Sequence, residues 1–298
     1  MAVTAARVEG VAAVATPPAR PFHWGPEVTW GIVLVIPYLV VFLAFVVWPV
    51  AYGLWLGASP AAFRTLFADP IYFESAWNTA VFLALGINIK LFLALLLSGF
   101  LAQARPWIRW LSVIFILPWA VPSIPTIFSF RWMLNSEWGM LNGLLWELFG
   151  IEGPWWLIEP HLAFGSVIFV HVWKYLPFWT LILLAGRMAI PTDLYEAATI
   201  DGARPLQKFA YVTWPQLKNL YITSTLLSTI WSLGDFNSVY LLTGGGPAEK
   251  THVLATLGIR YAFNLTQIDV GVACVMTALP FLVPLVVMLV RRLGGRVQ

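Results

Sequence analysis

The chain has 298 residues, of which 60% are hydrophobic and only 10% are charged, and its mean hydropathy is +0.80. An ordinary soluble domain carries roughly 25% charged residues, so this composition excludes a soluble protein and indicates one embedded in a lipid bilayer. The formal net charge of +3 includes no long basic run, which argues against nucleic acid as a partner, and the single cysteine, Cys274, excludes an internal disulfide.

The first 28 residues are rich in Ala, Val and Pro and contain a few scattered charges. They lack the basic start, apolar centre and small-residue cleavage site of a secretory signal. We therefore expect a retained N-terminal tail over 1–28, followed by a transmembrane domain over 29–298.

Six apolar stretches are long enough to cross a hydrocarbon core of about 30 Å, which takes about 20 helical residues. Lipid offers no hydrogen bonds to the backbone, so stretches of this length are expected to be helices. The sequence thus predicts an all-α membrane protein with six transmembrane helices. The expected spans are 30–56, 76–101, 110–133, 162–186, 219–242 and 269–290.

Lys and Arg are distributed unequally around the ends of these spans. Four lie on one side, together with most of the acidic residues, and eleven lie on the other. The eleven are Arg7, Arg20, Arg105, Arg109, Arg187, Arg204, Lys208, Lys218, Arg291, Arg292 and Arg296. Basic residues accumulate in cytoplasmic loops, so both termini are expected on the cytoplasmic side.

The longest cytoplasmic segment between spans, residues 189–218, has internal order. Asp193 and Glu196 have the spacing of a capping box, which predicts a helix from about 194 to 201. Gly202 is the residue type that ends helices in a left-handed turn. Pro205 is expected to open a second short helix, and Trp214-Pro215 to end it.

The first of these short helices presents small side chains. Leu194, Ala197 and Ala198 fall close together on it, which leaves an apolar surface that a groove on another protein could accept. The alternative is an amphipathic loop that lies on the membrane surface, and periodicity alone does not separate the two.

Three ionisable side chains lie deep within the spans, where each costs about 2.5–3.5 kcal/mol on insertion scales. Lys90 has no role that the sequence assigns. Lys174 and Asp235 form either a structural ion pair or part of a polar cavity. Their neighbours suit a sugar, which needs hydrogen-bonding groups together with flat aromatic faces. The candidate substrate-binding residues are His171, Lys174, Tyr175, Phe178, Ser228, Trp231, Ser232 and Asp235.

Two further features are expected to be structural. For His171 a buried, hydrogen-bonded role is an equal alternative, and the four histidines have no metal-ligand spacing. LTGGGPAEKT at 242–251 approaches the spacing of a phosphate-binding loop. It has Glu249 in place of the second glycine, follows no strand and is expected outside the cell, so we interpret its glycines as a cap where the fifth helix stops.

The stretch EAATIDGA, followed by RPLQKFAYVTWPQL, resembles the EAA motif of permease subunits of binding-protein-dependent ABC importers. Glu196, Ala197, Ala198 and Gly202 match that motif, as does Val212 ahead of Pro215. Further stretches at 116–142, 171–198 and 235–247 resemble the carbohydrate branch of the family, and the last is similar to the first of its two paired permeases. The resemblance extends from about Pro37 to Arg291. Two departures are the short external loop at 57–75 and Trp214, where the family usually has Leu.

The resemblance implies a type I ABC importer permease fold, located in the bacterial cytoplasmic membrane, that does no covalent chemistry. It implies that this chain binds no cofactor, and that ATP and Mg bind to partner subunits. The implied partners are a second related permease, two cytoplasmic ATPase subunits, an external solute-binding protein and the lipid bilayer. The implied ATPase-coupling residues are Leu194, Tyr195, Glu196, Ala197, Ala198, Asp201 and Gly202.

The expected function is therefore the permease of an ATP-driven sugar importer. Alternative solutes for the same machine are a polyol, a phosphorylated glycerol or a polyamine. An ion-coupled secondary transporter would use Lys174 and Asp235 as an ion relay, and it would have internal repeats, which we do not find on inspection. An intramembrane enzyme lacks a paired catalytic constellation.

Overall fold

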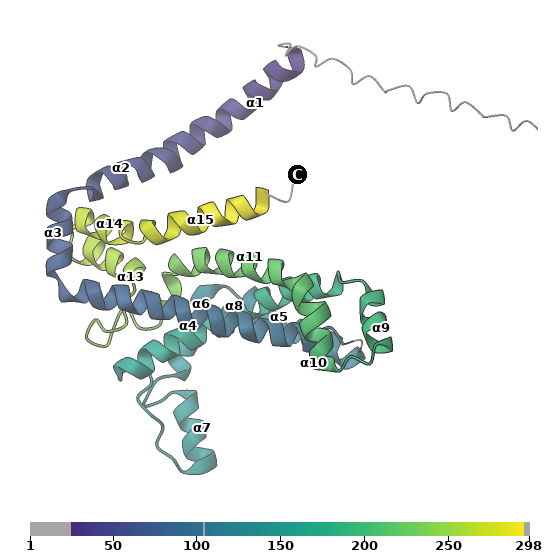
Figure 1. Ribbon diagram of the computed structural model, residues 1–298. Helices are drawn as coiled ribbons and strands as arrows, with labels where there is room; N and C mark the ends of the chain where they lie inside the picture. The colour runs from purple at the N-terminus through teal and green to yellow at the C-terminus, as the bar shows by residue number, and fades with distance from the viewer. Residues whose placement is uncertain (1–24, 104, 295–298) are drawn as a thin grey trace, which may run out of the picture. The chain divides into compact units, whose positions relative to one another are not determined.

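The structure is a computed structural model that describes residues 25–103 and 105–294 (Figure 1). The chain divides into two compact units, residues 1–51 and 52–298. Every regular element in the described residues is helical, which confirms the predicted all-α fold. The predicted tail lies outside the described residues as far as residue 24.

The described part of the first unit is a helical run that continues into the second. It comprises α1 (Pro26–Phe42), the π-helical segment η1 (Leu43–Val47) and the start of α2 (Trp48–Gly57). The 32 residues from Pro26 to Gly57 are long and apolar enough to cross a membrane. The side chains of α1 and η1 are almost all apolar, as expected of a helix within lipid.

Two π-helical segments, η1 and η2 (Phe209–Thr213), each directly precede a Trp-Pro pair. Proline has no N–H, and its ring presses on the carbonyl four residues back. In both places the Trp N–H bonds to the carbonyl five residues earlier, so the helix widens and continues. The expectation that Trp214-Pro215 ends a helix is therefore wrong, because α11 (Trp214–Leu233) follows η2 directly.

Two long helices form the centre of the second unit. They are α4 (Pro70–Leu101) and α8 (Pro160–Met188), which contain the predicted spans 76–101 and 162–186 and pack extensively against each other. Each begins with proline, whose fixed backbone angle suits the first helical position. The Asp69 side chain caps α4 by accepting the backbone N–H of Ile71 at 2.9 Å.

The predicted span 110–133 is not one straight helix. It divides into α5 (Pro106–Ala120) and α6 (Ser123–Met133), which meet at 94°. Val121 has the extended backbone that is favoured before a proline, and Pro122 cannot donate a helical hydrogen bond, so the chain turns there.

The last two predicted spans are also interrupted. The fifth, 219–242, ends with α11 at Leu233, and after Gly234 the chain forms only the single turn α12 (Asn237–Tyr240). The sixth divides into α14 (Ile268–Met276) and α15 (Leu279–Gly294), bent by 45°.

Within the described residues three helical runs are long and apolar enough to span a membrane, or five if each bent pair counts as one. The predicted span outside this set is the fifth, 219–242, which corresponds to α11; this helix is less apolar because it carries a series of Ser and Thr residues. The remaining helices are α3 (Pro60–Ala68), α7 (Met140–Phe149), α9 (Thr192–Ile200), α10 (Pro205–Lys208), α13 (Leu254–Ile259) and the π-helical η3 (Arg260–Asn264).

One hydrophobic cluster joins the long helices to the segment that follows α8. Leu91 on α4, Leu183 on α8 and Leu217 on α11 are buried in it, and Tyr195 of α9 packs against them. A movement of α9 would therefore shift the side chains that it contacts on α4, α8 and α11, since close-packed interiors transmit strain.

Candidate functional site

A buried polar cluster joins α4, α8 and the end of α11. Lys90 Nζ lies 2.9 Å from His171 Nε2, and His171 Nδ1 lies 2.7 Å from Asp235 Oδ2. An ammonium group can only donate, so Nε2 accepts from Lys90 and the imidazole proton is assigned to Nδ1, which donates to Asp235. Lys90, which the sequence left unassigned, is thus the positive end of a three-residue chain.

The Asp235 carboxylate is held by the turn that follows α11. The Ser238 backbone N–H donates to Oδ1 at 3.2 Å, and the Ser238 hydroxyl donates to Oδ2. Helix α11 ends at Leu233 with Gly234 as its C-cap residue. Asp235 therefore lies where the backbone departs from the helical axis. The short interruption after Leu233 therefore orients the carboxylate toward His171.

A cavity of about 320 Å³ adjoins this cluster. Six of the eight candidate substrate residues line it, and the structure adds four ring or polar side chains and one glycine that the sequence did not single out for this role. The six are His171, Tyr175, Ser228, Trp231, Ser232 and Asp235, and the additions are Lys90, Trp179, Gly234, Phe236 and Asn237. Aromatic faces and hydrogen-bonding groups therefore surround the same space.

The Ser228 side chain in this lining has a hydroxyl group that makes no hydrogen bond to the described residues. It is fully buried, and its Oγ has no hydrogen-bond partner in the described part of the chain. A buried hydroxyl without a partner is unfavourable by about 1–3 kcal/mol. A ligand hydroxyl in the cavity would remove that deficit.

Lys174 and Phe178 lie outside the cavity lining. Lys174 Nζ donates to the carbonyl oxygen of Pro118 at 2.8 Å and to that of Val121, while Phe178 stacks on Trp119 with ring centroids 5.3 Å apart. The alternative of a Lys174–Asp235 ion pair is wrong, because Asp235 pairs with His171. The last carbonyls of α5 have no helical partners and carry the negative end of its dipole, so they attract the ammonium group.

We expect Lys174→Met to lower the free energy of unfolding by about 1–3 kcal/mol, because part-buried carbonyls at the end of α5 lose their donor. Lys174→Arg keeps the charge and the donors and should retain most of the stability. Thermal unfolding of the detergent-purified protein, followed by tryptophan fluorescence, measures both variants. Equal midpoints for Met and wild type would show that the ammonium group does not hold the bend.

The first helix of the segment 189–218 begins at a different residue from the one predicted. Helix α9 begins at Thr192 with Pro191 as its N-cap residue, and no side chain caps it, so the Asp193 capping box is wrong. Asp193 instead lies in the first turn, where its charge favours the helix dipole. The other end agrees with prediction, because Gly202 has φ +74°.

The turn at Gly202 satisfies the last carbonyls of α9. The Gly202 N–H bonds to the Thr199 oxygen at 3.0 Å, and the Ala203 N–H bonds to the Ala198 oxygen at 2.9 Å. This is the Schellman arrangement, which requires a left-handed residue at Gly202. Open space surrounds the point where a Cβ on Gly202 would lie.

The outer surface of this segment is more apolar than the sequence pattern predicts. Leu194 is exposed as expected, and Ile200, Leu206 and Tyr211 are between 79% and 87% exposed. The helical spacing from Ala197 to Ile200 was a signal for the first of these. On the inner side, Tyr195 Oη lies 2.9 Å from Thr213 Oγ1 and ties α9 to η2.

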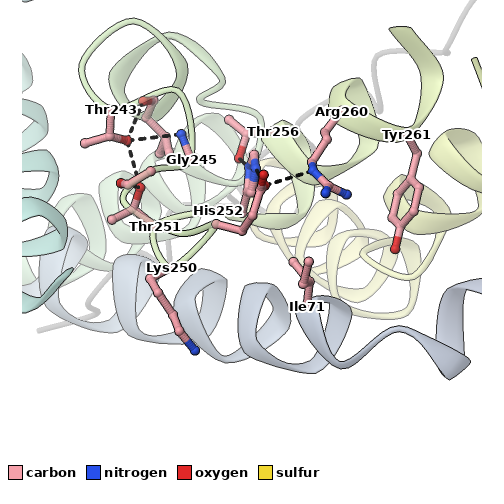
Figure 2. Close-up of polar contacts among 12 residues, drawn as sticks. Ile71, Thr243, Gly245, Lys250, Thr251, His252, Thr256, Arg260 and Tyr261 are labelled. Carbon is pink, nitrogen blue, oxygen red and sulfur yellow. Dashed lines mark hydrogen bonds and ion pairs between the residues drawn. The ribbon is translucent and has the colours of Figure 1, made fainter. Parts of the chain in front are cut away.

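The loop with the sequence LTGGGPAEKT is held by hydrogen bonds within itself and to neighbouring residues (Figure 2). Thr243 Oγ1 and Thr251 Oγ1 are 2.8 Å apart, and the Thr251 hydroxyl also bonds to the Gly246 oxygen. Gly244, at φ +65°, ends the single turn α12 and not the long helix α11, which corrects the expected position of this cap.

Glu249 belongs to this network and not to a phosphate site. Its Oε2 accepts from His252 Nε2 at 2.7 Å and from Arg260 Nε at 2.8 Å. Burial lowers the pKa of the His252 imidazole, and the Glu249 carboxylate opposes that shift. A Cβ on Gly245 would lie 2.1 Å from the His252 ring, so the glycine permits close contact between backbone and imidazole.

No group of three or more His, Cys, Asp or Glu side chains that could hold a metal occurs within residues 25–103 and 105–294. Among the titratable groups of the cavity, the lysine bonds to the histidine and the histidine bonds to the aspartate. The arrangement suits reversible binding through hydrogen bonds and ring faces.

Comparisons with known proteins point to one family. The family described as "Binding-protein-dependent transport system inner membrane component" matches residues 90–294. The trehalose/maltose transport system permease protein MalF of Thermococcus litoralis is 33% identical, over 83% of this chain and 88% of the relative. The sulfoquinovosyl glycerol transport system permease protein SmoG of Agrobacterium fabrum is 34% identical, over 73% of this chain and 71% of the relative.

A solved structure shares the fold. It is the crystal structure of a bacterial alginate ABC transporter in complex with an alginate pentasaccharide-bound periplasmic protein. One of its chains superposes with a TM-score of 0.75 at 20% identity, covering 89% of this chain and 93% of that one.

Proposed function

Because the chain belongs to the family of binding-protein-dependent transport system inner membrane components, which are non-catalytic permease subunits of ABC importers, we propose that it forms the membrane path for a sugar. The observation that carries this proposal is the cavity between α4, α8 and α11, where ring faces and hydrogen-bonding groups meet. The names of relatives that transport trehalose, maltose and sulfoquinovosyl glycerol support the same class of solute.

A sugar would use both kinds of surface in the cavity. The rings of Tyr175 and Trp231 offer flat faces to the C–H side of a pyranose, and Ser228 offers a hydroxyl that has no other partner. Phe178 and Trp179 stand behind Trp231, with ring centroids at 5.4 and 5.7 Å, and fix its position. Small-molecule sites commonly combine a mostly apolar lining with a few placed polar groups in this way.

The segment 189–218 would contact an ATPase subunit and transmit its movement during ATP hydrolysis to the membrane helices. Its exposed Leu194 and Ile200 give an apolar surface for a groove on an ATPase subunit, and the turn at Gly202 sets the angle between α9 and α10. The chain itself would bind neither ATP nor Mg, both of which would bind to two partner ATPases. The resemblance of this segment to the EAA motif supports that assignment.

The remaining partners are a second related permease and an external sugar-binding protein. The alginate transporter was solved together with its periplasmic protein, and this supports a similar partner for the present chain. We place the protein in the cytoplasmic membrane with both termini cytoplasmic, because eleven Lys and Arg residues lie near the span ends on that side.

Sugar uptake into proteoliposomes tests the proposed function. The complex is purified through a tag on this chain after co-expression with a related permease and an ATPase from the same organism, and the external binding protein is added. Uptake should require ATP and the binding protein and should not respond to an ion gradient. Gradient-driven uptake by this chain alone would instead establish an ion-coupled transporter.

We expect Tyr195→Phe to reduce transport per ATP hydrolysed by about fivefold, because the hydrogen bond that ties α9 to η2 is worth about 1 kcal/mol. Thr213→Val removes the same bond from its other end and should have the same effect, whereas Thr213→Ser keeps the hydroxyl. Uptake and phosphate release are measured in the same vesicles. If Tyr195→Phe transports as efficiently as wild type, the bond has no coupling role.

A further inference from the structure

Within the sugar-permease role proposed above, on which this inference rests, we infer that the cavity accepts an uncharged sugar and discriminates against an anionic one. The basis is the charge balance of the cavity lining. Among the residues that line it, only Lys90 and Asp235 bear a formal charge when His171 is neutral. Lys90 is 1% exposed and Asp235 is 9% exposed, so water screens neither of them well.

The two charges cancel through His171. Lys90 donates to one nitrogen of the imidazole, and the other nitrogen donates to Asp235. If the proton of Lys90 moves to His171, the imidazolium replaces the ammonium and the total stays at zero. The cavity therefore presents no net positive charge to a ligand in either arrangement.

The donors of Lys90 are also occupied. Its Nζ bonds to His171 Nε2, lies 3.4 Å from Ser232 Oγ, and is 5.6 Å from the centre of the Tyr175 ring. A sugar carboxylate could pair with Lys90 only by competing with the Asp235 carboxylate for the same positive charge. One of the two anions would then be buried without a counter-charge, which is strongly unfavourable.

An uncharged sugar meets no such penalty. Its hydroxyls can donate to and accept from Ser228 Oγ, which is buried and lacks a partner among the described residues. Its C–H faces can pack on Trp231, and neither contact changes the charge balance of Lys90, His171 and Asp235. The lining is thus complementary to hydroxyl groups and not to a carboxylate.

Matched pairs of sugars test this inference on the purified complex. Each pair is a neutral disaccharide, such as maltose or cellobiose, and the acid made by oxidising one CH₂OH group to a carboxylate. Binding is measured by titration calorimetry without nucleotide. We expect the neutral member of the bound pair to have a dissociation constant at least about tenfold lower than that of its acid.

Asp235→Asn removes the negative charge while keeping the shape of the side chain, and it leaves Lys90 without a counter-charge. The ratio of the two affinities should then shift toward the acid by about tenfold. Asp193→Asn removes the same charge from an exposed position on α9 and should leave the ratio unchanged.

Equal or tighter binding of the acid by the wild-type complex overturns this inference while leaving the proposed function intact, and this holds whether or not Asp235→Asn folds. An unchanged ratio in a folded Asp235→Asn complex also overturns it. Failure of every sugar in the panel, neutral and acidic alike, overturns the proposed function itself.

Discussion

Replacing Asp235 with alanine is expected to reduce sugar uptake by at least about tenfold. The change leaves His171 Nδ1 without its acceptor and Lys90 without its counter-charge, and breaking a buried ion pair by removing one partner costs about 3–5 kcal/mol. Because the cluster joins α4, α8 and the end of α11, its loss should distort the cavity lining more than the proposed coupling segment, residues 189–218. Uptake into proteoliposomes measures the effect.

Two variants separate this effect from a general loss of structure. Ser238→Ala removes one hydrogen bond to Asp235 without changing any charge, and it should impair uptake less. Glu159→Ala removes an exposed carboxylate at the start of α8 and should leave uptake unchanged. The ATPase should still copurify with Asp235→Ala. Wild-type uptake by that variant would remove Asp235 from the translocation path.

The helical fold and its approximate spans could be predicted because lipid leaves a long apolar stretch few alternatives to a helix. The interruptions were harder to predict, since they depend on how each proline is accommodated. Pro122 ends α5, whereas Pro215 is absorbed by a π-helical turn. Both follow the same rule about missing N–H groups, and only the surrounding packing decides which outcome is more stable.

The cavity shows what the sequence could supply and what it could not. The helical spacing of Ser228, Trp231 and Ser232 was enough to predict that they share one face of their helix. The identity of ion pairs required distances between helices. Lys174 and Asp235 have opposite charges and could have formed an ion pair. In the structure, Asp235 instead pairs with His171, and Lys174 donates to carbonyls at the end of α5.

A helical connection between the segment 189–218 and the cavity also emerges only in three dimensions. The chain is continuously helical from Pro205 to Leu233, which is roughly 40 Å at 1.5 Å per residue. One end carries the turn at Gly202, and the other carries Ser228 and Ser232 of the cavity lining. A movement imposed at the first end would therefore pass along one uninterrupted helical run, which contains the widened turn η2 and bends between α10 and α11 (Figure 1).

Replacing Gly202 with tryptophan is expected to abolish ATP-driven uptake, because it would block the docking of an ATPase subunit at the proposed coupling segment. The reasoning depends on the space around this residue. A Cβ there meets nothing within 4 Å, so the bulky side chain would project away from the rest of the chain. The left-handed backbone at this position also destabilises the folded protein by about 1–2 kcal/mol when the residue is not glycine, and the size of this effect depends on the side chain.

Asparagine at Gly202 isolates the backbone term, since Asn tolerates the left-handed conformation and is small. Gly202→Asn should retain most ATPase binding and uptake, whereas Gly202→Trp should lose both while its unfolding midpoint stays close to that of Asn. If the two variants fail equally, the strained turn is responsible and not a partner surface. If both transport normally, the turn at Gly202 has no part in coupling, and ATPase contact must lie elsewhere on the cytoplasmic face.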